Sequence, residues 1–129
     1  MAEKSVVRTD NAPAPFQGAP YSQAIVANGL VFVSGQLGLQ PDHAEMVGDT
    51  IEEQTRQVLD NLEAILTEAG TGLDRIVKTT VFLQSLDDFQ GMNSVYAERV
   101  GETPPARSTI EVAGLPSGAL VEIEAIALA

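Results

Sequence analysis

Residues 51–83, IEEQTRQVLDNLEAILTEAGTGLDRIVKTTVFL, join an amphipathic run to a β-branched run and decide the fold. In residues 51–69 the apolar side chains recur at helical spacing and the charged ones fall elsewhere, which predicts a helix with one buried face. Thr50 followed by Glu53 forms a capping box at its start. Residues 76–83 are rich in Ile, Val and Thr and predict a strand. The chain therefore contains at least one helix that leads directly into a strand.

A β-hairpin is predicted just before this helix. Residues 23–27 and 30–34 are short apolar runs, and Asn28-Gly29 between them is the strongest two-residue signal for a hairpin turn. Because the helix joins this hairpin to the next strand, the three elements suggest a β-α-β unit. The proline-rich residues 10–20 are expected to form an irregular lead-in.

A second helix and two closing strands follow. Ser85, three residues before Asp88, predicts a helix start, and Gly101 with the two prolines after it predicts the end. The patterns of residues 106–112 and 120–128 predict two strands. The predicted order is β-β-α-β-α-β-β, an α/β (α+β) fold with a mixed sheet and both helices on one face. The inward stripe of the second helix is expected to comprise Leu86, Phe89, Met92 or Asn93, Tyr96 and Val100.

The strands carry apolar side chains on both faces of the predicted sheet. Phe32 and Phe82 each alternate with apolar neighbours that point the opposite way. Two helices cover only one face, so something else must cover the second. Self-association is the economical answer, since closed homo-oligomers are common. The sequence therefore predicts an obligate oligomer.

Composition describes a single globular domain spanning 1–129. The chain has 129 residues, of which 44% are hydrophobic, and a domain of this size buries a sizeable core without disulfides or metals. It has no cysteine, which excludes a thiol nucleophile and any Cys-ligated metal. Its one histidine, His43, is expected to be solvated in a polar loop over residues 36–49. No metal site is predicted.

Charge and motifs exclude several classes of function. The 18 acidic and 7 basic residues give a formal net charge of −11, which disfavours nucleic acid as a partner. No segment approaches the roughly 20 apolar residues of a membrane span, and residues 1–10 lack the apolar core of a signal peptide, so we expect a cytoplasmic protein. The chain contains no Walker or dinucleotide glycine loop, no HExxH and no GxSxG.

The last two predicted strands hold the charged candidates for chemistry. Arg107, Thr109 and Glu111 share one face of the first, and Glu122 and Glu124 share one face of the second. If the two strands lie side by side, Arg107 and a glutamate meet on one surface, which places an anion-binding group beside an acid or base. Alternatively, Arg107 forms a structural ion pair with Glu122 or Glu124, or these charges face solvent.

Each of the other candidate residues either contacts a ligand or has a purely structural role. Asn93 interrupts the inward stripe of the second helix, where it either contacts a ligand or is a core asparagine bonded to the backbone. Ser34-Gly35 is a small step where the backbone can approach a ligand, although most such steps are turns. Tyr21 follows the proline-rich lead-in and either closes a pocket or simply packs.

Seven motifs follow one another over nearly the whole chain. They are APYSQA at 19–24, VSGQ at 33–36, QTRQVLDNL at 54–62, IVKTTVFL at 76–83, MNSVYAE at 92–98, PPARSTIEV at 104–112 and EIEAIA at 122–127. In this order they resemble the family of RidA/YjgF reactive-intermediate deaminases. The resemblance implies a chorismate-mutase-like fold assembled as a homotrimer, with sites in the clefts between subunits.

The resemblance also implies an activity. Members of this family hydrolyse reactive 2-imino acids or their enamine tautomers, such as 2-iminobutanoate and 2-iminopropanoate, to 2-oxo acids and ammonia without cofactor. Arg107 would grip the substrate carboxylate, and Glu122 would hold and polarise the attacking water. The cleft would be lined by Tyr21, Ser34, Gly35 and Asn93, with the backbone of Thr109 placing the water or the imine nitrogen.

Two departures from the family pattern and two competing functions remain. Many close members carry cysteine where this chain has Thr109, and glycine where it has Ala19. If the family's cysteine acts through its main chain, Thr109 preserves that role, but it excludes thiol-dependent regulation.

One alternative function is a non-catalytic regulatory trimer that binds small carboxylates. The other, a ribonuclease or translation inhibitor, is weakened by the acidic charge.

Overall fold

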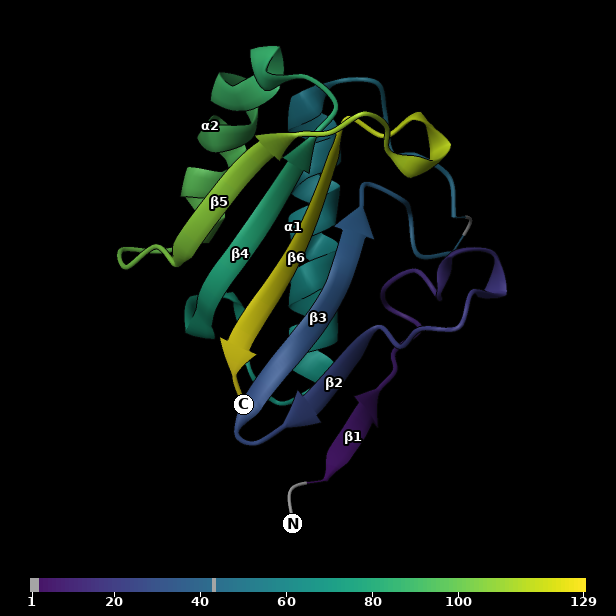
Figure 1. Ribbon diagram of the computed structural model, residues 1–129, viewed down its shortest axis with the longest axis vertical. Coiled ribbons are helices and arrows are strands. Elements are labelled where there is room, and N and C mark those ends of the chain that lie inside the picture. Colours follow the sequence, from purple (N-terminus) through teal and green to yellow (C-terminus); the bar gives the residue numbers. More distant parts are fainter. Residues whose placement is uncertain (1–2, 43) are drawn as a thin grey trace.

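The computed structural model describes residues 3–42 and 44–129, so the expectation for His43 falls outside the described residues. It has a six-stranded mixed sheet in the order β1-β2-β3-β6-β4-β5 and two α-helices (Figure 1). This confirms the predicted fold class. The strands are β1 Lys4–Val7, β2 Ala24–Ala27, β3 Leu30–Leu37, β4 Ile76–Leu83, β5 Ala106–Glu111 and β6 Val121–Leu128, and the helices are α1 Ile51–Glu68 and α2 Phe89–Arg99.

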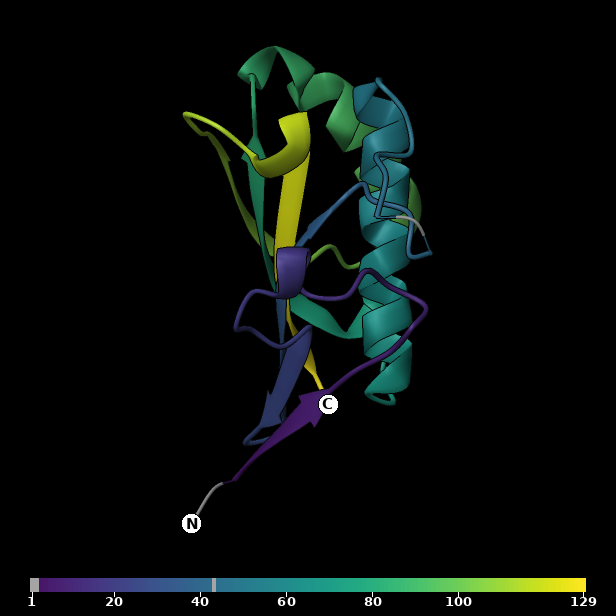
Figure 2. The same cartoon turned by 90° about the vertical axis from the view of Figure 1, so that its right-hand side faces the viewer.

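Both helices lie on the same side of the sheet, as predicted (Figure 2). The core between the two layers consists of fully buried side chains of α1, such as Leu62 and Ile65, against residues of the central strands such as Val81 and Ile123. The face of the sheet away from the helices leaves Phe32 43% exposed and Ile110 46% exposed. The apolar second face predicted from strand alternation is therefore present.

The central strands form a split β-α-β arrangement. β3 and β4 are connected by α1, but β6 lies between them and runs antiparallel to both. Among the six strands of the described residues, only β4 and β5, which α2 connects, pair in parallel. The two closing strands consequently do not lie side by side, because β4 separates β5 from β6. Arg107 was expected to meet a glutamate if these two strands were neighbours, and they are not.

Local signals in the sequence correspond to the observed turns and caps. Asn28 and Gly29 both have positive φ, 52° and 79°, as a type I′ hairpin turn requires. Thr50 caps α1: its Oγ1 accepts the Glu53 N–H at 3.1 Å and donates to the Glu53 carboxylate at 2.8 Å. Gly70, with φ of 86°, follows the helix end.

Two strands differ by more than one residue from the sequence expectation. The predicted order lacked β1, a four-residue edge strand that pairs with β2 and leaves three of its four residues exposed. Such a strand has too little alternating burial to produce a pattern. In addition, β3 continues to Leu37 instead of ending at Ser34, because a register shift between Val33 and Gln36 lets the strand carry on past the irregularity.

α2 begins at Phe89, three residues after Leu86, the first residue of the predicted inward stripe. Residues Leu86–Asp88 form a short 3₁₀ turn, η3, and Leu86 is 49% exposed. Met92, Tyr96 and Val100 are buried as expected, but Val95 is buried as well. The stripe was wrong at Leu86 because the 3₁₀ turn before α2 changes the angular position of that residue. In the described part of the chain, neither helix is both long and apolar enough to cross a membrane.

Candidate functional site

A cavity of about 460 Å³ lies between the N-terminal segment, the last residues of β3 and the first residues of β6. Four of the residues singled out in the sequence line it together: Tyr21, Ser34, Gly35 and Glu122. They come from three separate parts of the chain. The remaining lining residues are Pro13, Ala14, Phe16, Ala19, Gln36, Leu37, Leu39, Pro116 and Glu124.

Ser34 and Gly35 form the irregular step within β3. The Ser34 hydroxyl donates to the Ser22 carbonyl at 2.6 Å, and the Ser34 N–H donates to the Gln23 carbonyl at 2.9 Å. A Cβ at Gly35 would run into the carboxylate of Glu122. The absence of a side chain at Gly35 is therefore what lets the carboxylate lie against the strand. The step is part of a strand and not a plain turn.

Tyr21 stands at the mouth of the cavity and is 43% exposed. Its hydroxyl oxygen accepts the Phe16 N–H at 2.6 Å, which ties the proline-rich segment to the start of the hairpin. The hydroxyl proton is left to donate to a ligand, since this bond uses only the oxygen.

Glu122 is half-buried on β6, and its pKa is raised above the ordinary value. Removal of water by burial is the main cause, and the neighbouring charge of Glu124 adds to it. A carboxylate with a raised pKa holds a proton more readily than one in open water. Glu122 is thus suited to accept a proton from a bound water and return it later.

Arg107 lies on the opposite face of the sheet from Glu122. Its guanidinium carbon is 4.8 Å from the ring centre of Tyr96 and 5.6 Å from that of Phe89, both on α2. Tyr96 in turn shares a hydrogen bond of 2.7 Å with the Thr79 hydroxyl. The expectation that Arg107 and a glutamate of β6 share one surface is wrong within a single chain, because Glu122 sits in register with Phe82 on the open face.

The guanidinium of Arg107 has no carboxylate partner among residues 3–42 and 44–129. The structural ion pair considered as an alternative is therefore absent there, and the interhelical ion pairs are made by Arg99, with Asp60 and Glu63. Aromatic faces hold Arg107 in place, and its Nη1 donates a hydrogen bond of 4.0 Å to the Met92 sulfur. The other N–H groups of the guanidinium are left for a ligand. Such a cation is suited to bind a carboxylate from outside the chain.

Asn93 and Thr109 lie on the same elements as the groups that surround Arg107. The Asn93 Oδ1 is buried and has no hydrogen-bond partner in the described structure, so the alternative of a backbone-bonded core asparagine does not account for it. Thr109 is half-buried, two residues from Arg107 on the same face of β5.

One chain therefore presents two separate groups of candidate residues. The first is the cavity with Tyr21, Ser34, Gly35 and Glu122, and the second is the Arg107 surface over α2. Sequence reasoning missed the apolar wall of the cavity around Phe16, and it missed Tyr96 and Phe89 as supports for Arg107, because it assigned both rings to the core. Across the described residues, no cluster of three His, Asp or Glu side chains is suited to hold a metal.

The chain is similar to several known proteins. The family model described as Endoribonuclease L-PSP matches residues 9–129. Reactive Intermediate Deaminase A, chloroplastic, of Arabidopsis thaliana is 49% identical over 125 residues, which is 97% of this chain and 66% of that protein. YyfA of Yersinia pestis, described as a protein of unknown function of the conserved Rid family, has a crystal structure with a TM-score of 0.93 and 50% identity, covering 98% of this chain and 100% of that one. E. coli TdcF with bound serine has a TM-score of 0.90 and 38% identity, covering 97% and 98%.

Proposed function

The chain belongs to the RidA/YjgF family, whose family model is described as Endoribonuclease L-PSP, and from this premise we propose that it hydrolyses reactive 2-imino acids to 2-oxo acids and ammonia. The observation that carries the proposal is the half-buried, unpaired guanidinium of Arg107 together with the raised pKa of Glu122. A cation for the substrate carboxylate and a carboxylate for water are the two groups that this reaction needs. Two substrates suit it, 2-iminobutanoate and 2-iminopropanoate.

The proposal includes assembly as a homotrimer with sites between subunits. In one chain, Arg107 and Glu122 stand on opposite faces of the sheet, so a single copy cannot offer both to one small molecule. A neighbouring copy that covers the open face would bring its Arg107 surface to the cavity. A heterologous contact of this kind, repeated around a closed ring, gives a cyclic oligomer.

The chemistry follows from these positions. Arg107 binds the carboxylate of the substrate bidentately, and Asn93 and the backbone at Thr109 bind polar atoms nearby. Glu122 takes a proton from water as the water oxygen bonds to the imine carbon, and the C=N electron pair moves to nitrogen. The proton then passes to that nitrogen. Glu122 next takes the hydroxyl proton of the adduct and passes it to the nitrogen as the C–O bond becomes the carbonyl and the C–N bond breaks, so that ammonia leaves with both protons of the water and a 2-oxo acid remains. The Tyr21 hydroxyl and Ser34-Gly35 line the space for the water.

The relatives support this proposal at the level of class. One of them is named as a reactive-intermediate deaminase, and the structure of another holds serine, a small molecule with a carboxylate. The family description also names an endoribonuclease. A formal net charge of −11 does not favour RNA binding, so we place the deaminase first.

The test generates 2-imino acids in the presence of the protein. An amino-acid oxidase forms 2-iminopropanoate and 2-iminobutanoate, semicarbazide traps them, and the protein competes with the trap if it is a deaminase. We expect wild type to lower semicarbazone formation, Arg107→Ala to lose the effect, and Arg56→Ala, which removes an exposed arginine of α1, to keep it.

Two outcomes would count against the proposal. Equal competition by wild type and Arg107→Ala would mean that this arginine does not bind the substrate. Saturable binding of 2-oxo acids without any competition would instead favour the small-carboxylate-binding regulatory trimer. Salt-sensitive binding of RNA would favour the function of a ribonuclease or translation inhibitor.

A further inference from the structure

The guanidinium of Arg107 is supported by neutral side chains of α2. Its carbon lies 4.8 Å from the ring centre of Tyr96 and 5.6 Å from that of Phe89, and its Nη1 donates to the Met92 sulfur at 4.0 Å. Neutral supports leave the positive charge free to attract a ligand, whereas a carboxylate partner would compete with the ligand. The direction of the guanidinium then depends on how firmly the rings beneath it are held.

One hydrogen bond fixes the ring of Tyr96 against the sheet. Its hydroxyl lies 2.7 Å from the hydroxyl of Thr79 on β4, and the two residues are 5% and 2% exposed. Thr79 is in register with Arg107 in the parallel pair of β4 and β5, which lie side by side in Figure 1. Because neighbouring strands are about 4.8 Å apart, the anchor of the ring stands directly beside the backbone of the arginine. The ring therefore reaches from α2 to the sheet and is held at both ends.

Burial keeps Tyr96 neutral in this position. It is the largest influence on the pKa of the phenol, which lies above its ordinary value although the bond to Thr79 and the charge of Arg107 each lower it. At neutral pH the phenol keeps its proton, and one of the two hydroxyls donates to the other. A phenolate at the same place would be an anion beside Arg107 and would compete with the carboxylate of a ligand.

We propose that the hydroxyl pair of Thr79 and Tyr96 positions Arg107, so that the planar fork of its guanidinium faces the carboxylate of the substrate. This inference rests on the proposed function, because it concerns the arginine that binds the substrate there. Thr79 and Tyr96 are positioning residues that act through Arg107. An arginine already held in its binding direction loses less rotamer freedom when the ligand arrives. Loss of either hydroxyl should therefore weaken the binding of carboxylates.

The test measures the affinity for 2-oxobutanoate, the product expected from 2-iminobutanoate, by calorimetry. Thr79→Val and Tyr96→Phe each delete one hydroxyl and keep the shape of the side chain. Each should weaken binding by about tenfold, because a shifted guanidinium loses one of its two bonds to the carboxylate. The double variant should lose no more than either single variant, since both remove the same hydrogen bond. Thr79→Ser, which keeps the hydroxyl, should stay within about twofold of wild type.

Thr55→Val is the matched control. Thr55 is fully buried on α1, and its hydroxyl has no hydrogen-bond partner within the described structure. The substitution makes the same chemical change as Thr79→Val but breaks no bond, so the affinity for 2-oxobutanoate should stay within about twofold of wild type. A similar loss of affinity in Thr55→Val and Thr79→Val would show that the effect is general, and would overturn the inference.

A second background tests whether the hydroxyl pair acts through Arg107. Arg107→Lys keeps the positive charge but replaces the planar fork with a compact ammonium, whose donors need no fixed plane. Adding Thr79→Val or Tyr96→Phe to Arg107→Lys should change the affinity by less than about twofold. A full loss in this background too, or wild-type affinity in Thr79→Val and Tyr96→Phe alone, would overturn the inference. If one of these variants does not fold, the other carries the same test, since each deletes one half of the bond.

The calorimetric readout separates this inference from the proposed function, because binding does not depend on turnover. If wild type hydrolyses neither imine, the proposed function fails, while a selective loss of affinity in Thr79→Val and Tyr96→Phe would still support the positioning role. If wild type hydrolyses the imines and both variants keep its affinity for 2-oxobutanoate, only the positioning role fails.

Discussion

Glu122 is the residue whose protonation the surrounding side chains control. Burial raises its pKa first, and the charge of Glu124 raises that pKa further. In the proposed reaction Glu122 must be ionised to accept a proton from water. Activity should therefore rise with pH through the pKa of Glu122 and level off above it.

Glu124→Gln removes the charge contribution and leaves burial in place. The pKa of Glu122 should fall, because its ionised form no longer faces a second carboxylate. The acidic limb of the profile of kcat/KM against pH should move to lower pH, and the plateau should stay within a few-fold of wild type. A limb that stays in place, or that moves to higher pH, would show that Glu122 is not the titrating base.

Gly35 is the residue that gives the Glu122 carboxylate its room. In Gly35→Ala the new methyl group collides with that carboxylate, which is the far end of a flexible side chain and moves away. We expect a loss of turnover of about 100-fold, as for misplaced catalytic groups, with little change in the melting temperature. Full activity in Gly35→Ala would contradict the position assigned to Glu122.

At the scale of elements, α1 positions the wall of the cavity through a buried amide. Asn61 is fully buried, and its Nδ2 donates to the carbonyls of Leu37 and Leu39, both at 3.0 Å. Both leucines line the cavity. The helix thus fixes the end of β3 where the backbone no longer pairs regularly with its neighbour.

Asn61→Ala removes the side-chain donor to the carbonyls of Leu37 and Leu39. We expect it to lower the free energy of unfolding by about 1–3 kcal/mol, the cost of an unsatisfied buried polar group. Urea denaturation measures this change. Gln57→Ala is the matched control: Gln57 donates only to Asn61, at 2.9 Å, so its loss should cost less. Equal effects of the two substitutions would argue against Asn61 as the anchor.

The elements also show which parts of the fold a sequence pattern can predict. The hairpin at Asn28-Gly29, the cap at Thr50 and the two-layer arrangement follow from local chemistry and periodicity, and the structure confirms them. The insertion of β6 between β3 and β4 depends on long-range pairing, which leaves no local signal. The short edge strand β1 was missed for a similar reason.

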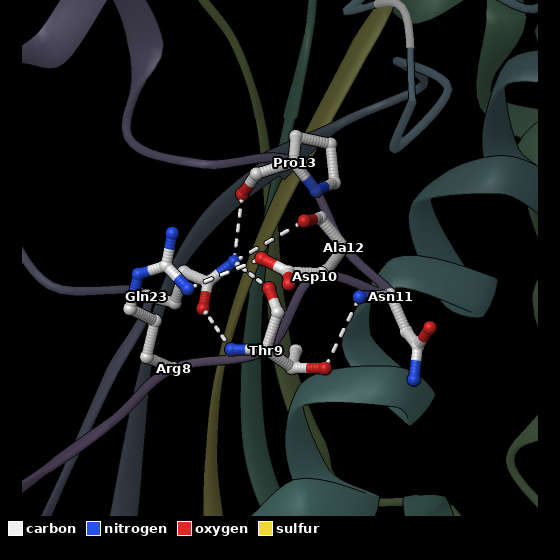
Figure 3. A network of polar contacts seen from close by, with 7 residues as sticks. All are labelled: Arg8, Thr9, Asp10, Asn11, Ala12, Pro13 and Gln23. Carbon is white, nitrogen blue, oxygen red and sulfur yellow. Dashed lines mark hydrogen bonds and ion pairs between the residues drawn. The ribbon is translucent and has the colours of Figure 1, made fainter.

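The candidate site could also be predicted from the sequence only in part. Tyr21, Ser34, Gly35 and Glu122 were singled out from the sequence and do line one cavity. The expectation that Arg107 and a glutamate of the last strand share one surface was wrong within one chain, because β4 lies between β5 and β6 and Glu122 is on the open face. Gln23 was missed. Its buried amide bonds to the backbone of Thr9, Ala12 and Pro13 (Figure 3), and a glutamine in an apolar run gives no sign of such contacts.

At the scale of the whole molecule, the open face of the sheet is where a second copy is expected. Phe32 and Ile110 are partly exposed on the side without helices. If the protein forms the proposed trimer, we expect Phe32→Glu to convert it to a monomer in light scattering after gel filtration, and to abolish turnover. Burying a charge at an interface is costly without a partner. Thr67→Glu, which adds the same charge to the exposed side of α1, should leave the trimer intact. A trimer that persists in Phe32→Glu would place the interface elsewhere.

The most direct test of the account is to mix two inactive variants, Arg107→Ala and Glu122→Gln, by refolding them together. If each site takes Arg107 from one copy and Glu122 from another, random mixing in equal amounts should restore about one quarter of the wild-type activity, because in a heterologous interface one quarter of the sites then combine both intact residues. Recovery near this level in the semicarbazide assay would support a shared site. Mixed oligomers verified by native mass spectrometry that remain inactive would contradict it.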